Sequence, residues 1–166
     1  MEKIDSWVDK LAVAMALLGG FVLIGIIVAT CLSITGRELA VLGLGPISGD
    51  YEIVEIGTAF AVFSFLPLCT LRRAHATVDL MMPALGKWGN RISDLLVSVL
   101  MAVLSIVIAW RLFVGMGEKR LYLETTFILQ FPVWIAYAIC MAGALVFVVV
   151  ALWSLVRTVS GGGSRV

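Results

Sequence analysis

Two glutamates near the start of an apolar run have the residue type and the spacing to do chemistry. Glu52 and Glu55 are three positions apart, so in a helix both side chains lie on one face. A carboxylate near the edge of a bilayer can relay protons or bind a cation. The structural alternative is an ion pair with Arg37, which follows the preceding apolar run, and we favour that alternative.

The densest polar cluster follows the same run and contains Arg72, Arg73, His75 and Asp79. If the helix continues, His75 and Asp79 lie four positions apart and can hydrogen-bond. One histidine and one aspartate are too few ligands for a metal site. No serine or cysteine lies near them in sequence to act as a nucleophile. The cluster therefore indicates a capped, salt-bridged turn that ends a helix.

A third group of polar and aromatic residues precedes the last apolar run and includes Thr126, Gln130, Pro132 and Trp134. Proline is typical of the first turn of a helix or of a kink. Tryptophan is enriched where helices meet the membrane surface. We expect Trp134 to be an interfacial anchor rather than part of a ligand site.

The remaining reactive residue types argue against a cofactor. Cys31, Cys69 and Cys140 lie far apart inside apolar runs, which predicts buried thiols rather than a disulfide framework or a CxxC redox centre. A single histidine cannot supply a bis-histidine haem or a zinc cluster. We therefore expect no cofactor, no metal and no catalytic residues. The net charge of +1, without a basic stripe, also predicts no nucleic-acid partner.

These residues lie on a chain that is too apolar for a soluble domain. Hydrophobic residues make up 61% and charged residues 14% of the 166 positions, whereas soluble domains have about half and about a quarter. Apolar runs predict four membrane spans at about 11–34, 53–71, 92–114 and 129–156, followed by a flexible tail at 158–166. The fold class expected is an all-α integral membrane protein, with residues 1–166 forming a single domain.

Two shorter segments have the pattern of amphipathic helices that lie at the membrane surface. In the first, Ile4, Trp7, Val8 and Leu11 recur at helical spacing, and the second runs from Val78 to Trp88. Four spans place both termini on one side of the membrane. Cytoplasmic termini would put eight basic residues inside (Lys3, Lys10, Arg72, Arg73, Lys87, Arg91, Arg157, Arg165) and four outside (Arg37, Arg111, Lys119, Arg120). The positive-inside rule therefore predicts cytoplasmic termini.

The order and spacing of these groups resemble the DctQ-like small membrane subunit of tripartite ATP-independent periplasmic (TRAP) transporters. The stretch 55–80 is similar to the family's second helix and to the H-x-x-V-D element that follows it. A second similarity covers 125–137, where threonine, leucine-x-x-proline-x-tryptophan and tyrosine occur in order. The residues that carry the resemblance are Arg37, Glu55, Arg72, Arg73, His75, Val78, Asp79, Thr126, Pro132 and Trp134.

The resemblance implies a non-enzymatic subunit of a bacterial or archaeal cytoplasmic membrane. It would act as a scaffold for a larger DctM-like membrane subunit that carries the substrate and sodium sites. A periplasmic DctP-like binding protein would deliver an organic acid for sodium-coupled uptake. The residues that match the motifs would organise the fold or contact a partner.

Two other classes of protein fit the span count. A four-helix membrane enzyme that handles glutathione needs arginine and tyrosine around a thiolate, but Tyr51, Tyr122 and Tyr137 all lie away from the Arg72 cluster in sequence. A self-sufficient small exporter needs an acidic residue well inside a span, and Glu55 is the one candidate. Thiol-transfer or quinone-reduction assays would identify the enzyme, and resistance of cells that overexpress the chain alone would identify the exporter.

Overall fold

The computed structural model describes residues 2–39, 45, 47–72 and 86–159. Four helices account for most of them: α1 (Glu2–Glu38), α2 (Asp50–Leu71), α3 (Gly86–Leu121) and α4 (Val133–Val159). Among the described residues, the β-structure is one isolated bridge between Thr125 and Pro132. The part of the chain that the structure describes is therefore all-helical, as the sequence predicted.

Each helix contains a stretch that is long and apolar enough to cross a membrane: Asp5–Glu38, Asp50–Leu71, Asp94–Leu121 and Val133–Val159. The shortest has 22 residues, which at ~1.5 Å per residue gives about 33 Å, slightly more than the ~30 Å hydrocarbon core of a bilayer. This agrees with the predicted number of spans.

The helix bounds differ from the expected spans in two places. The amphipathic segment around Trp7 is continuous with the first span, in a single 37-residue helix. The last helix begins at Val133 rather than near 129, because Gln130 has a positive φ of 54° and the Thr125–Pro132 bridge folds the preceding residues into a turn. The second amphipathic segment lies mostly at 73–85, and the tail from residue 160 onward also falls outside the described residues.

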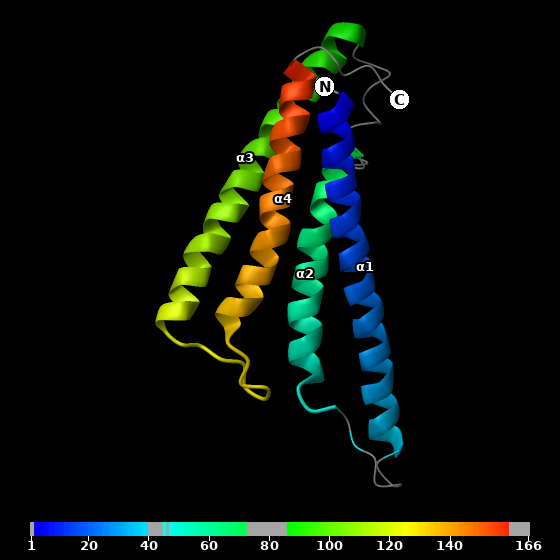
Figure 1. The fold of residues 1–166 in the computed structure, drawn as a ribbon, viewed down its shortest axis with the longest axis vertical. Helices are drawn as coiled ribbons and strands as arrows, with labels where there is room; N and C mark the ends of the chain where they lie inside the picture. Colours follow the sequence, from blue (N-terminus) through cyan, green and yellow to red (C-terminus); the bar gives the residue numbers. More distant parts are fainter. Residues whose placement is uncertain (1, 40–44, 46, 73–85, 160–166) are drawn as a thin grey trace.

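The helices form one layer rather than a closed square bundle. Figure 1 shows them in the order α3, α4, α2, α1 across the molecule, with the N-terminus at the same end as the end of α4. The extensive contacts are α3 with α4, α4 with α2, and α2 with α1, whereas α1 and α4 touch only slightly. Both broad faces of this layer are therefore left without a covering helix from the described part of the chain.

Small residues allow the neighbouring helices to approach closely. A Cβ atom placed on Gly143 of α4 would lie 2.9 Å from the carbonyl oxygen of Phe63 in α2. Pro67 lacks an N–H and so cannot bond that i−4 carbonyl within α2. At the other side of α2, a Cβ on Gly19 of α1 would lie 2.8 Å from the Ser64 Cβ. Glycine at these crossings gives the close packing on which helix association in a membrane depends.

A cluster of buried apolar side chains lies at the end of the layer that holds the termini. Val8 and Ala12 of α1 pack there with Val150 of α4, and Trp153 covers them. Large apolar side chains elsewhere are exposed along both outer helices, for example Phe21 and Ile24 on α1 and Leu96 and Val103 on α3. Such extensive exposed apolar surface requires lipid or another membrane protein around it.

One sequence prediction about the core is wrong. Cys140 is buried and Cys69 is partly buried, but Cys31 is exposed. The reason is its position on α1, away from the side that meets α2 through Ile26 and Ser33. The apolar surroundings of Cys31 must come from outside the chain.

Candidate functional site

The polar contacts at the end of the layer away from the termini centre on the first turn of α2. Gly49 precedes that turn with a positive φ of 80°, a conformation that glycine adopts without strain. Asp50 and Glu52 then lie where the free N–H groups of the helix favour negative charge. The Ser33 hydroxyl of α1 donates to Asp50 Oδ2 at 2.5 Å and so ties α1 to the start of α2.

Glu52 holds the connection between α3 and α4. Its Oε1 accepts a hydrogen bond from the Ile128 N–H at 2.7 Å, and its Oε2 accepts one from the Leu129 N–H at 2.9 Å. The residue is 7% exposed, so both carboxylate oxygens are used inside the protein. Glu52 therefore makes these two hydrogen bonds and not the expected ion pair with Arg37. Arg37 is exposed at the end of α1.

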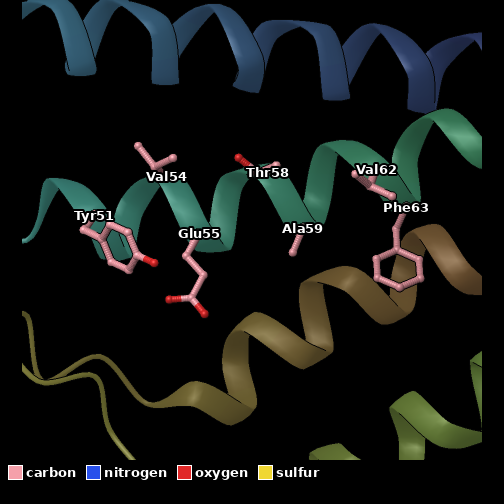
Figure 2. Close-up of a pocket in the computed structure, with 7 residues that line it drawn as sticks. All are labelled: Tyr51, Val54, Glu55, Thr58, Ala59, Val62 and Phe63. Atoms are coloured by element: carbon pink, nitrogen blue, oxygen red, sulfur yellow. The ribbon is translucent and has the colours of Figure 1, made fainter.

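Glu55 has a different environment from Glu52. It is exposed and lines a shallow groove of about 410 Å³ along α2, with Tyr51, Thr58 and Val62 among its neighbours. Figure 2 shows its carboxylate pointing away from α1, on the side of α2 where α4 and the chain before it lie. Glu55 thus remains the candidate partner contact of the pair, whereas Glu52 is structural.

The residues singled out around the start of the last span are brought together by the structure. The Thr126 hydroxyl accepts a hydrogen bond from the Phe131 N–H at 3.0 Å, and Pro132 closes the turn through its bridge to Thr125. The Arg120 guanidinium lies 5.7 Å from the centre of the Trp134 ring, a cation–π geometry. These contacts position the start of α4. The role of Trp134 as an interfacial anchor stays a prediction.

The Arg72 cluster is described only in part. Arg72 follows α2 and its guanidinium lies 3.7 Å from a carboxylate oxygen of Asp9 in α1. Both side chains are largely exposed, so this ion pair contributes little to stability. Arg73, His75 and Asp79 lie outside the described residues. The sequence predicted a salt-bridged turn at the end of α2, but it did not identify Asp9 as the partner of Arg72. No local pattern of residues links two positions that are so far apart in the chain.

Within the described ranges, no group of three or more histidine, cysteine, aspartate or glutamate side chains is arranged to hold a metal ion. The polar side chains instead join helices to one another or to connections. Besides the contacts at Glu52 and Ser33, the Trp153 indole N–H donates to Asp5 Oδ1 at 2.8 Å, which links α4 to α1. The arrangement is that of a braced membrane layer.

The comparison with protein families gives this layer an identity. The family model described as the DctQ component of tripartite ATP-independent periplasmic transporters matches residues 26–161. Comparisons with curated proteins and with solved structures gave no match. The matched range covers most of the chain, from the second half of α1 through α4, and it confirms the resemblance seen in the sequence. The chain belongs to the DctQ family, the small membrane component of TRAP transporters.

Proposed function

We propose that this chain is the small permease subunit that scaffolds a larger, DctM-like subunit in sodium-coupled uptake of an organic acid. A DctP-like binding protein delivers the acid from the periplasm. The family match supports the place in a tripartite transporter. The single structural observation that supports a scaffold is the open layer, in which α1 and α3 expose long rows of apolar side chains.

A layer of this kind suits a static partner. Each of its three helix contacts is held by close packing or by side-chain hydrogen bonds, and the first turn of α2 is bonded both to α1 and to the α3–α4 connection. A rigid subunit can hold one part of a transporter in place while another part moves across the bilayer. The broad apolar faces supply the area for lipid and for the larger subunit.

The chain lies in a bacterial or archaeal cytoplasmic membrane in this proposal, with both termini in the cytoplasm. The described basic residues at the termini end of the layer include Lys10, Arg72 and Arg157, and the connections at the other end are bordered by Arg37 and Lys119. The positive-inside rule supports this orientation when the remaining basic residues of the sequence are added.

The first experiment is purification of the tagged chain from its native membranes in a mild detergent, followed by mass spectrometry. We expect a many-span membrane protein in roughly equal amount. Recovery of the chain alone as a homo-oligomer would contradict the proposal and would favour a membrane enzyme or a small exporter.

Uptake by proteoliposomes tests the scaffold role itself. Vesicles that contain both membrane subunits and receive the binding protein should accumulate an organic acid only while a sodium gradient is present. Vesicles that lack this chain should lose most of that uptake. Sodium-driven uptake by this chain alone would contradict a scaffold without its own transport site.

A further inference from the structure

The uncharged stretch that contains α4 starts well before the helix does. From Thr125 to Val156 the sequence has no charged residue, yet α4 begins only at Val133. The residues from Thr125 to Pro132, here named the hook, are therefore as free of charge as a membrane span but are not helical. Irregular backbone that faces lipid does not occur within the hydrocarbon region, so an exposed non-helical segment of this kind belongs at the membrane surface, with its polar groups satisfied.

Several backbone N–H groups of the hook are hydrogen-bonded within the hook or to α2. The Thr126 N–H donates to the Phe131 carbonyl at 2.9 Å, and the Phe131 N–H donates back to the Thr126 hydroxyl. The Ile128 and Leu129 N–H groups donate to the Glu52 carboxylate. Pro132 has no N–H to satisfy. The Gln130 side-chain amide also donates to the Phe127 carbonyl at 3.1 Å.

Three consecutive apolar side chains of the hook are exposed, next to the polar side chains of Thr125 and Gln130. Phe127 is 96% exposed, Ile128 60% and Leu129 45%. Two contacts fix the hook in place. The Glu52 carboxylate accepts hydrogen bonds from two of its N–H groups, and the Leu129 side chain packs directly against Gly49. Exposing an aromatic side chain to water on a fixed, uncharged turn costs free energy. Such a side chain is favoured instead at the boundary between the headgroups and acyl chains of a membrane.

The charges next to the hook have the arrangement expected at a membrane surface. Lys119 and Glu124 form an ion pair just before it, and Arg120 lies over the Trp134 ring just after it. The hook continues directly into the apolar surface of α4. We propose that the hook inserts its apolar side chains into the boundary between headgroups and acyl chains of the lipid bilayer, at the end of the layer opposite the termini, and that Glu52 keeps it in the inserting conformation.

This inference depends on the chain lying in a membrane and not on what the transporter carries. The test uses the full chain, with its three cysteines replaced by alanine and a nitroxide spin label on Phe127→Cys. The protein is reconstituted into vesicles of phosphatidylethanolamine and phosphatidylglycerol. Collision of the label with oxygen, which partitions into lipid, is compared with collision with a water-soluble nickel chelate. Labels on Leu145→Cys, exposed on α4, and on Glu38→Cys, exposed at the charged end of α1, are the references for lipid and for water.

We expect the label at position 127 to fall between the two references, with oxygen collisions several-fold more frequent relative to nickel than at Glu38 and less frequent than at Leu145. Adding Glu52→Gln should make the label mobile and move its collision ratio toward that of the label at Glu38. A label at 127 that collides with nickel as often as the one at Glu38 would overturn the proposal.

The same measurement on the complex with the larger membrane subunit distinguishes lipid from protein as the neighbour of the hook. If the label at 127 stays accessible to oxygen in that complex, lipid is the occupant. If it becomes immobile and loses contact with oxygen, the hook is a protein contact and the lipid assignment is wrong. If no larger subunit is recovered, the proposed function fails while the measurement in vesicles of the chain alone still decides the inference.

Discussion

At the scale of single residues, two glutamates on one turn of α2 have opposite roles. Glu52 is buried and accepts two backbone N–H groups, whereas Glu55 is exposed in a groove. A buried carboxylate that accepts such hydrogen bonds leaves its donors unsatisfied when it is changed. When an exposed carboxylate without a partner among the described residues is replaced, no hydrogen-bond donor of the isolated chain loses its acceptor.

Glu52→Gln should therefore loosen the hook. A glutamine presents one acceptor oxygen and one amide group, so one of the two hook N–H groups loses its partner. We expect cleavage between α3 and α4 by an added protease to become several-fold faster in detergent, together with a lower melting temperature. The matched control is Glu55→Gln, which should change neither. Equal effects of the two substitutions would show that Glu52 has no special structural role.

Gly143 is the second residue whose identity is set by its surroundings. Its missing side chain allows α4 to meet the Phe63 carbonyl, which Pro67 leaves without a helical partner. Gly143→Leu forces the helices apart and should cost about 1–3 kcal/mol, since the contacted atom is backbone and cannot rotate away. Unfolding of the purified protein in denaturing detergent measures the loss. Gly25→Ala, where a Cβ meets nothing within 4 Å, should be neutral or slightly stabilising.

At the scale of helices, α1 depends on its contacts at both ends. Near the termini, Asp5 accepts the Trp153 indole N–H of α4, and at the far end Ser33 bonds Asp50 of α2. Between them the helix packs on α2 through small residues such as Gly19. These two polar contacts fix the position of a helix that otherwise touches α4 only slightly.

Trp153→Phe isolates the contribution of the contact near the termini. The phenyl ring keeps most of the apolar packing but removes the indole N–H, so the loss should be that of one hydrogen bond, about 0.5–1.5 kcal/mol. Thermal unfolding followed by the melting temperature should detect it. Trp110→Phe is the control, because Trp110 is exposed on α3. A larger effect at Trp110 than at Trp153 would contradict the bracing role of the Asp5 contact.

At the scale of the whole molecule, the orientation of the layer can be measured directly. We expect Ser48→Cys, in a chain whose three native cysteines are replaced, to react with a membrane-impermeant maleimide added to intact spheroplasts. Asp9→Cys should react only after the cells are opened, since it lies near the N-terminal end of α1. The reverse pattern would place the termini outside and would contradict the positive-inside prediction.

The open layer also explains why the molecule has little core of its own. Its fully buried side chains are mostly small, such as Ala12, Ser33 and Ala144, while large apolar side chains face outward. Closely packed small residues and an apolar exterior are the arrangement that a membrane favours, because lipid and protein interiors are equally apolar. The layer is therefore suited to a surrounding of lipid and to the larger subunit that we propose as its partner.

The sequence alone determined the number of helices, their membrane character and the family, because hydropathy and helix-breaking residues act locally along the chain. It did not determine where α4 begins, since the uncharged run from Thr125 onward reads as part of a span. It also did not show which glutamate is structural. Both were decided by the tertiary structure, in which Glu52 reaches N–H groups 76 and 77 positions away and holds an uncharged segment out of the helix. Contacts over that separation depend on how the helices pack, which no local pattern of residues specifies.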